Sequence, residues 1–570
     1  MDYFKNNTLH RPSHFNFAND VVDTWAERSP PLEAMLWVSP DKTRSKALSY
    51  AHFSRQSHRI AVLLETLGAS RGDVMMVVLP RVPAWWEVVT AGLRSGIVTA
   101  PATTLLTAAD IEYRCRMSKA AVFVGDAASI AKVQTVRHRC CELRVLLQVD
   151  GDGDGDATPK VGPGVVDLYD ALRAIENNAE YPSTRQTWDA PAMLYFTSGS
   201  TGMPKMVRHN QVSYGLAHVL TGKHWLALEV GKLCWNFTEQ GWAKAAYSYI
   251  GAWTCGASLF VWDCRDTQAL NTATLLDLLH RFPITTFCAP PLIWQHLTTL
   301  STLQYTKDHP PLALAHCTSA GEPLNPGAMA RWYSHTGIPI REGYGQTETS
   351  LMCGHYGDLV IRPGSMGKPL PGVPLHVITP AGKEARVDEE GELALLLGEG
   401  DDPSAFFGIY DGYVGKDGVV RRDERVITGQ GRWYLTGDRA TQDGDGYIWF
   451  VGRADDVINS SGYRIGPFEV ESTLLSHPAV SECAVISSPD SVRGGVVKAI
   501  IVLAADYASS DPAHLIKEIQ DYCKKSSAPY KYPRKIDFVS AASLPRTTSG
   551  KIQRALLRKK EWAGVSSPKL

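Results

Sequence analysis

The first two thirds of the chain alternate between short apolar runs and segments with helical periodicity. Residues 73–80 (DVMMVVLP), 120–126 (AAVFVGD), 143–150 (LRVLLQVD) and 284–291 (ITTFCAPP) are apolar runs rich in strand-forming residues, which is typical of strands buried on both faces. Residues 84–96 (AWWEVVTAGLRSG) repeat apolar positions at a helical spacing. This alternation predicts an α/β fold in which helices cover parallel sheets.

The pattern changes near residue 455, where the predicted elements become shorter. They are helices at 468–478 and 513–525 and strands at 480–488 and 495–505. The last part of the chain, about 115 residues, has the usual size of one domain. The sequence therefore predicts a large N-terminal domain of helix-covered sheets over residues 1–454 and a small α+β domain over residues 455–570.

Composition excludes several classes of protein. Lys and Arg number 58 and Asp and Glu 59, so the formal net charge is −1, and no global charge draws the chain to nucleic acid or an anionic membrane. No apolar run is long enough to span a bilayer. The 11 cysteines are scattered, apart from the adjacent Cys140 and Cys141, and form no CxxC pair. This favours reduced thiols over a disulfide framework.

The two ends of the chain predict its location. Residues 1–20 lack the apolar core of a signal peptide and the Arg-rich, acid-poor character of a transit peptide. The chain ends Pro568-Lys569-Leu570, which is close to the peroxisomal S-K-L signal except that proline stands where a small residue is expected. A solvated tail that ends in Lys-Leu by chance is the alternative. We expect a cytoplasmic or peroxisomal protein that is not secreted.

Residues 194–210 (LYFTSGSTGMPKMVRHN) leave an apolar run and enter a loop dense in Gly, Ser and Thr that is closed by Lys205. Such a loop suits phosphate, because glycines allow close backbone approach and hydroxyl and N–H groups form an anion nest. It is not a Walker A loop, since Pro204 replaces the second glycine and no Ser or Thr follows Lys205. It is not a nucleophile elbow around Ser200 either. Alone, it could also be a mobile surface turn.

Four further motifs follow this loop in a fixed order. They are SAGEPL at 319–324, REGYGQTETS at 341–350, WYLTGDRATQDGDGYIWFVGRADDVINSSGYRIGPFEVE at 433–471 and LPRTTSGKIQR at 544–554. Together with residues 195–205 they resemble the adenylate-forming superfamily of acyl-CoA synthetases, nonribosomal adenylation domains and luciferases. The resemblance covers the chain from about Phe15 to Arg558, and the motif sequences are most similar to those of the medium-chain acyl-CoA synthetase branch.

The resemblance implies an AMP-forming ligase that activates a short-chain, medium-chain or aryl carboxylic acid with ATP and transfers the acyl group to CoA. The enzyme needs positioning and charge neutralisation but no covalent nucleophile. By resemblance, Lys551 is the catalytic lysine that bridges the carboxylate and the α-phosphate, and Thr347 contacts that phosphate. Glu348 binds Mg²⁺ on the phosphate oxygens, and a carboxylate oxygen suits this ion.

The resemblance also implies the nucleotide-binding residues. The loop wraps the β- and γ-phosphates, the segment at 321–323 lines the adenine, Tyr344 stacks on the base, and Asp438 and Arg453 hold the ribose. Without the resemblance, Tyr344 could be a core residue and the last two a surface ion pair. The full predicted set is Thr197, Ser198, Gly199, Ser200, Thr201, Gly202, Lys205, Gly321, Glu322, Pro323, Tyr344, Asp438, Arg453 and Arg464.

The second half-reaction requires the thiol to reach the adenylate. Family members swing the small domain about a hinge that matches Asp455, although this residue could instead be an ordinary turn residue. After the swing, Ser461 and Gly462 face the CoA tunnel and Arg464 lies near phosphate. Trp242 lies near the acyl tunnel by resemblance, although most rings around it are expected to be core packing.

Two other functional classes remain open. One is a stand-alone adenylating enzyme that loads the pantetheine of a separate carrier protein. The other is a non-catalytic nucleotide- or acyl-binding relative, which the presence of Glu348, Asp438 and Lys551 argues against. The expected partners are a small carboxylic acid, ATP and CoA, without nucleic acid or a membrane span, in a monomer or small homo-oligomer.

Overall fold

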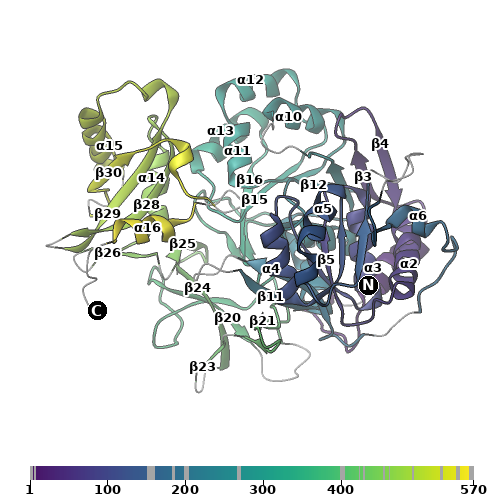
Figure 1. Ribbon diagram of the computed structural model, residues 1–570. Helices are drawn as coiled ribbons and strands as arrows, with labels where there is room; N and C mark the ends of the chain where they lie inside the picture. Colours follow the sequence, from purple (N-terminus) through teal and green to yellow (C-terminus); the bar gives the residue numbers. More distant parts are fainter. Residues whose placement is uncertain are drawn as a thin grey trace.

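The structure is a computed structural model, and it shows a large body and a smaller one set to its side (Figure 1). It describes residues 4–5, 8–150, 161–182, 186–197, 204–265, 271–397, 405–422, 424–427, 431–453, 456–460, 463–490, 493–526, 530–546 and 552–563. The mixed α/β architecture confirms the predicted fold class. The first strands, β1 (Phe4–Lys5) and β2 (Thr8–Leu9), form a two-stranded ribbon.

The first large sheet contains three of the predicted buried runs. Its order is β22 (Val420–Arg421), β21 (Gly412–Val414), β11 (Lys205–Asn210), β10 (Pro191–Thr197), β6 (Val98–Pro101), β5 (Val74–Val78), β7 (Ala120–Gly125), β8 (Val145–Gln148) and β9 (Val166–Asp167). The strands from β10 to β9 are parallel. The strands from β10 to β22 are antiparallel. The sheet thus joins a helix-covered parallel part to an antiparallel extension.

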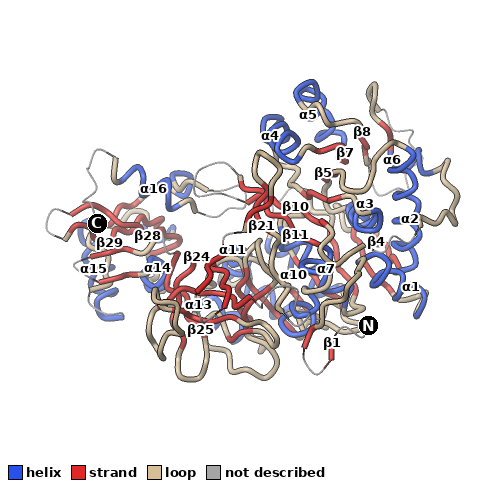
Figure 2. Tube along the Cα trace, turned by 90° about the horizontal axis from the view of Figure 1, so that it is seen from below, coloured by secondary structure: helices blue, strands red, loops and turns tan. Residues whose placement is uncertain are grey.

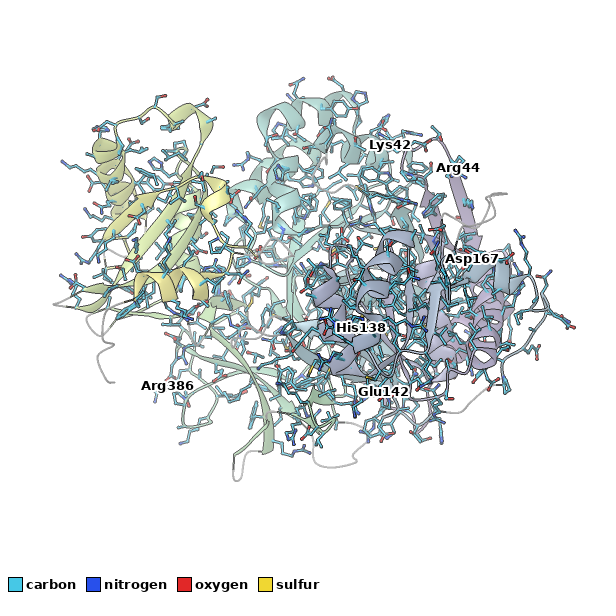
Figure 3. The ribbon with its side chains drawn as sticks, viewed as in Figure 1. Lys42, Arg44, His138, Glu142, Asp167 and Arg386 are labelled. Atoms are coloured by element: carbon cyan, nitrogen blue, oxygen red, sulfur yellow. The ribbon has the colours of Figure 1, made fainter. Side chains whose placement is uncertain are left out.

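The second large sheet is also mainly parallel. Its order is β18 (Lys368–Pro369), β17 (Leu351–Gly354), β16 (Ile340–Gly345), β15 (His316–Ala320), β14 (Thr286–Cys288), β12 (Leu233–Asn236), β13 (Ser258–Trp262), β3 (Glu33–Val38) and β4 (Ser45–Ser49). The edge strand β4 follows a turn that carries Lys42 and Arg44, labelled in Figure 3. Charged side chains beside an exposed strand discourage pairing with another sheet.

The core between these sheets is built around α3 (Pro83–Ser95), every residue of which is buried. Pro83 suits the first turn of the helix, and Gly96 ends it in the left-handed conformation. Its buried cation, Arg94, donates to Asp23 at 2.7 Å, which offsets the cost of burying the charge. The predicted helix at 84–96 is therefore confirmed, and it is apolar on most sides because it is enclosed.

The remaining helices of the large body pack around and between the two sheets. They are α1 (Thr24–Arg28), α2 (Tyr50–Thr66), α4 (Ala108–Ser118), α5 (Ala127–Val136), α6 (Leu168–Leu172), α7 (Gln211–Gly215), α8 (His218–Leu220), α9 (Ala243–Thr254), α10 (Thr272–Arg281), α11 (Pro291–Leu297), α12 (Leu300–Asp308) and α13 (Pro326–Thr336). Within the part of the chain that the structure describes, no helix is long and apolar enough to cross a membrane.

A third, antiparallel sheet follows the second one, and the sequence analysis did not predict it. It runs β19 (Leu375–Ile378), β20 (Gly391–Leu397), β24 (Gly431–Gln442) and β23 (Glu424–Ile427), with β25 (Ile448–Arg453) paired to β24. Ile378, Ala394 and Trp433 form a small core of its own. Its strand β23 lies at the bottom of the view in Figure 1, and β24 carries the TGD motif.

The small body contains the elements predicted after residue 455. They are β26 (Ile458–Ser460), β27 (Tyr463–Ile465), α14 (Pro467–Leu475), β28 (Val480–Asp490), β29 (Gly494–Leu503), α15 (Pro512–Ser526), β30 (Lys535–Phe538) and α16 (Arg554–Glu561). The three-stranded sheet has the order β28-β29-β30. Its core includes Val470, Val485 and Ile519 and draws only on residues of this part of the chain.

Candidate active site

The predicted phosphate loop joins the ends of a β-hairpin. Thr197 is the last residue of β10 and pairs with Lys205, the first residue of β11. The two strands hold the root of the loop in register, and α4 supports it: the Tyr113 hydroxyl donates to Pro204 O at 3.1 Å. The predicted residues Ser198, Gly199, Ser200, Thr201 and Gly202 lie outside the described residues.

Tyr413 of β21 connects this hairpin to the predicted metal ligand. The Lys205 ammonium lies 4.6 Å from the centroid of the Tyr413 ring. The Tyr413 hydroxyl donates to Glu348 Oε1 at 2.8 Å. Burial, followed by the charge of Glu348, raises the pKa of Tyr413 well above its ordinary value, so the hydroxyl keeps its proton and remains a donor. Lys205 and Glu348, 143 positions apart in the sequence, therefore share one contact residue.

His209 connects the same hairpin to Thr347. The ring lies on β11 and is fully buried, and its Nε2 is 2.7 Å from Thr347 O. Burial lowers the pKa of His209 to about 4, so the ring is neutral at pH 7. Since a carbonyl oxygen only accepts, Nε2 carries the proton and Nδ1 accepts from Ser213 Oγ at 3.1 Å. The backbone that presents Thr347 is thereby fixed to the hairpin.

The segment predicted to line the adenine begins with a conformationally restricted glycine. Gly321 has φ +104°, a value that side-chain-bearing residues rarely adopt. A Cβ at this position would lie 2.1 Å from Lys244 Nζ, and that ammonium donates to Ala320 O at 2.8 Å. Glu322 and Pro323 follow and are exposed. The chain therefore turns here with its backbone held close to Lys244.

A buried carboxyl group holds the other end of this turn. Glu342 Oε1 of β16 accepts from the backbone N–H of Leu324 at 2.8 Å. Burial raises the pKa of Glu342 to about 7, because the charged form loses hydration. The exposed segment at 321–323 is thus fixed on one side by Lys244 and on the other by Glu342.

Tyr344 and Asp438 lie in direct contact. The Tyr344 hydroxyl donates to Asp438 Oδ2 at 2.5 Å, and Gln346 Nε2 donates to the same oxygen at 2.8 Å. Burial, with the Asp438 charge second, raises the pKa of Tyr344 well above its ordinary value. Arg453 is the cross-strand partner of Asp438 between β24 and β25 and is exposed. The two motifs at 341–350 and 433–471 therefore meet at one carboxylate.

Several predicted residues are placed only in part. Trp242 is half-buried and directly precedes α9. Arg464 belongs to β27. Lys551, Ser461, Gly462 and Asp455 lie outside the described residues. A cavity of about 20 Å³ is lined by residues that include Trp86 and Gln240 but not Trp242, and it has room for about one water molecule.

The sequence analysis missed five residues that organise the site: Tyr413, Gln346, Glu342, His209 and Lys244. Gln346 and Glu342 lie inside the quoted motif at 341–350, so that motif could have indicated them. His209 follows the loop closely, but an isolated buried histidine gives no signal in one sequence. Tyr413 and Lys244 act through contacts with distant segments, which hydrophobic periodicity does not report.

The residues present fit a magnesium ion bound together with substrate phosphates. Within the described ranges, no group of three or more His, Cys, Asp or Glu side chains is placed to hold a metal ion. Mg²⁺ bound with a nucleotide usually takes only one or two carboxylates beside phosphate oxygens. Glu348 is half-buried and has one oxygen fixed by Tyr413, so its carboxylate is oriented without being enclosed.

Known proteins resemble the chain over nearly its whole length. Acyl-coenzyme A synthetase ACSM5, mitochondrial, of Mus musculus is 41% identical over 557 residues, which are 97% of this chain and 91% of that protein. Acyl-coenzyme A synthetase ACSM4, mitochondrial, of Homo sapiens is 41% identical over 559 residues, 97% and 92% of the two chains. The crystal structure of the anthranilate CoA ligase AuaEII in complex with anthranoyl-AMP has a TM-score of 0.81 at 27% identity and covers 96% and 98%.

These relatives correct the predicted location. Both synthetases are named as mitochondrial, which conflicts with a cytoplasmic or peroxisomal protein. That prediction relied on residues 1–20, which lack the character of a signal or transit peptide, and on the terminal Pro568-Lys569-Leu570, which lies outside the described residues. A targeting receptor reads a few side chains in a specific order, and here Pro568 breaks the order. The prediction was therefore wrong.

Two family patterns match the chain in the order of its two bodies. Residues 22–396 match the AMP-binding enzyme family. Residues 469–551 match the AMP-binding enzyme C-terminal domain. The second match lies in the small body, as the resemblance implied. The chain therefore belongs to the AMP-binding enzyme family, and within that family to the acyl-coenzyme A synthetases.

Proposed function

We propose that this protein is an AMP-forming acid–CoA ligase. The observation that carries the proposal is the convergence of three distant motifs: Lys205 and Glu348 contact Tyr413, and Tyr344 contacts Asp438. One region thus offers a cation for phosphates, a carboxylate for a metal and a carboxylate for ribose hydroxyls. The kinship with acyl-coenzyme A synthetases favours CoA as the acyl acceptor over a carrier protein.

In the first half-reaction, a carboxylate oxygen of the acid attacks the α-phosphorus of ATP, and the bond from that phosphorus to the bridging oxygen of the β-phosphate breaks. The products are an acyl adenylate and pyrophosphate. Lys205 and the loop at 197–205 stabilise the departing pyrophosphate, and Thr347 contacts the α-phosphate. In the second half-reaction, the CoA thiolate attacks the acyl carbon and AMP leaves.

The nucleotide is held by groups on the second and third sheets. Asp438 accepts from the ribose hydroxyls, with Arg453 beside it, and the segment from Gly321 through Glu322 to Pro323 lines the adenine. Tyr344 stacks on the base. Its hydroxyl bond to Asp438 supports this assignment, because it fixes the ring and the ribose acceptor relative to each other.

Magnesium is the metal that we assign to Glu348. When bound, it neutralises phosphate charge as pyrophosphate departs. Glu348 supplies one carboxylate, and Tyr413 orients that carboxylate toward the phosphate-binding hairpin. A single protein carboxylate agrees with the preference of Mg²⁺ for few protein ligands in nucleotide sites.

The small domain supplies the last catalytic group. We place its boundary at residues 454 and 455, which is supported by the separate core around Val470. Lys551 cancels repulsion between the carboxylate and the α-phosphate during adenylation. A rotation about Asp455 then withdraws it, brings Ser461 and Gly462 toward the CoA tunnel and places Arg464 near phosphate.

The acid belongs to the short-chain, medium-chain or aryl class, and its tunnel passes Trp242. The first experiment is pyrophosphate release with ATP and Mg²⁺ over straight-chain, branched and aryl acids, with and without CoA. Release that requires an acid, yields acyl-CoA when CoA is present and collapses in Lys551→Ala supports the proposal. Binding of ATP without pyrophosphate release from any acid overturns it, and release unaffected by Lys551→Ala removes the role of that lysine. Size-exclusion chromatography with light scattering distinguishes a monomer from a small homo-oligomer.

A further inference from the structure

Tyr413 lies on β21, and this strand is held in place relative to both Lys205 and Glu348. In the antiparallel pair of β11 and β21, Val207 stands opposite Tyr413. Lys205 is two positions from Val207 and so lies on the same face of the sheet, diagonal to Tyr413. Figure 2 shows β21 beside β11 and β10. The contact of the ammonium with the ring is thus a consequence of strand register.

The approach of Tyr413 to Glu348 is fixed by backbone contacts. The chain before β21 runs antiparallel to the segment after Glu348: the Tyr410 N–H donates to Glu348 O at 2.7 Å, and the Ser350 N–H donates to Gly408 O at 2.8 Å. These bonds hold Tyr413 so that its hydroxyl reaches the Glu348 carboxylate at 2.8 Å.

A half-buried ion pair anchors the start of β21. Asp411 accepts from Arg208 Nε at 2.9 Å and from Asn210 Nδ2 at 2.7 Å, and both donors lie on β11. Separating the Asp411 carboxylate from these two donors costs free energy, so the contacts hold the start of β21 in place. The position of Tyr413, two residues later, is therefore set by three sets of contacts: the strand register, the backbone hydrogen bonds and this anchor.

We propose that Tyr413 is a positioning residue that couples the metal and pyrophosphate ends of the site. Its hydroxyl proton occupies one oxygen of Glu348 and so orients the other, and its ring face holds the Lys205 ammonium. The metal-binding carboxylate and the phosphate-binding ammonium therefore keep a fixed separation through one rigid side chain. This inference rests on the proposed function, and it adds a residue outside every motif on which that function is based.

The two contacts are separable by substitution. Tyr413→Phe removes the hydroxyl bond and keeps the ring, and Tyr413→Leu removes both. Tyr447 provides a matched control outside the site: Lys368 Nζ lies 4.8 Å from its ring centroid, and its hydroxyl donates to Val360 O at 2.7 Å. Tyr447→Phe thus makes the same chemical change at a ring whose partners are Lys368 and Val360.

The test is calorimetric titration of the full chain with ATP, in the absence of acid, with and without Mg²⁺. The quantity compared is the ratio of the ATP affinity with Mg²⁺ to the ATP affinity without it. We expect Tyr413→Phe to lower this ratio about ten-fold or more, as for a lost hydrogen bond to a charged group. Affinity for ATP without Mg²⁺ stays within about two-fold. Tyr413→Leu also weakens Mg²⁺-free binding several-fold by the loss of the cation–π contact. Tyr447→Phe changes neither.

The Mg²⁺ concentration for half-maximal pyrophosphate release rises in parallel, while KM for the acid and for CoA stays constant. When Tyr413→Phe is added to Glu348→Gln, it has no further effect on the increase of ATP affinity by Mg²⁺, because no carboxylate remains to orient. This double-mutant cycle also controls for a general loss of structure. An unchanged Mg²⁺ enhancement in Tyr413→Phe with an active wild type overturns the positioning role alone. A wild type that neither binds ATP nor releases pyrophosphate overturns the proposed function together with it.

Discussion

Gly321 is held at φ +104° directly beside the Lys244 ammonium, and this position shows how single residues shape the nucleotide site. The ends of the turn at 321–323 are tied to neighbouring elements. The turn is fixed from outside by Lys244 on Ala320 O and by Glu342 on the Leu324 N–H. The glycine was predicted from its motif, but the lysine that requires it could only be found from the structure.

Gly321→Ala should raise KM for ATP about ten-fold, because a Cβ displaces the ammonium that holds Ala320 and shifts the adenine segment. Gly337 is the matched control. It also has a positive φ, of +69°, but no atom lies within 4 Å of its Cβ position. Both variants should lose about 1 kcal/mol of stability from backbone strain, measured by thermal unfolding. Equal KM values for ATP in the two variants would contradict the role assigned to Lys244.

His209 predicts a pH dependence of stability. Its folded pKa of about 4 lies below the ordinary value of 6.5, so the unfolded chain takes up the proton first as the pH falls. The contribution of the neutral His209 ring to the free energy of unfolding is complete above about pH 6.5. Between about pH 6.5 and pH 4 this contribution falls by roughly 1.4 kcal/mol for each pH unit. His209→Gln should therefore flatten the dependence of the free energy of unfolding on pH in this window.

His316 supplies the control for this prediction. Burial also lowers its pKa to about 4, and its ring bonds to Trp225 O at 2.7 Å instead of to the site. His316→Gln should flatten the same window by a similar amount and leave pyrophosphate release unchanged. Only His209→Gln should slow that release, since only His209 holds Thr347. An equal loss of activity in the two variants would argue against this link.

At the scale of elements, periodicity predicted the buried strands and α3 because each is decided by its own run of side chains. The strands β5, β7 and β8 are three, one and four residues shorter than the predicted runs, since the runs include residues of the connecting loops. The antiparallel strands β21, near the edge of the first sheet, and β24, in the third sheet, were not predicted. Many of their side chains are only half-buried, and β21 pairs with β11, which is distant in sequence. The link through Tyr413 depends on this pairing and so escaped the sequence analysis.

The small domain depends on a buried ion pair between α14 and α16. Arg554 donates to Glu471 at 2.9 and 2.6 Å in a bidentate arrangement, and Glu471 is almost fully buried. Arg554→Gln leaves that carboxylate without its cation, so we expect a loss of about 3 kcal/mol of local stability. Hydrogen exchange of amides in β28 and β29 measures it.

The exposed pair of Arg173 and Asp170, whose side chains are 73% and 60% exposed, gives the comparison. Arg173→Gln should cost less than about 1 kcal/mol. If Arg554→Gln left exchange in β28 and β29 as slow as in the wild type, the ion pair would not stabilise the small domain. Burial raises the pKa of Glu471 despite this pairing, so the carboxyl group depends on Arg554 to stay charged.

At the scale of the whole molecule, the order of the two domains was predictable. The motifs occur in the fixed order of the family that they resemble, and the predicted helices and strands become shorter near residue 455. The acid-binding site was not predictable, since the large aromatic side chains around Trp242 are indistinguishable from core residues in a sequence. Location was predicted wrongly because a targeting address depends on a few specific side chains that a receptor reads, and the general character of the two ends of the chain does not identify such an address.

The central claim is that the acid is activated by attack of its own carboxylate on the α-phosphorus of ATP. The most direct measurement uses an accepted acid labelled with ¹⁸O in its carboxylate, with ATP, Mg²⁺ and CoA, followed by mass spectrometry of the products. Adenylation predicts one ¹⁸O atom in the phosphate of AMP and unlabelled pyrophosphate. Label in inorganic phosphate, or acyl-CoA formed alongside unlabelled AMP, would contradict it.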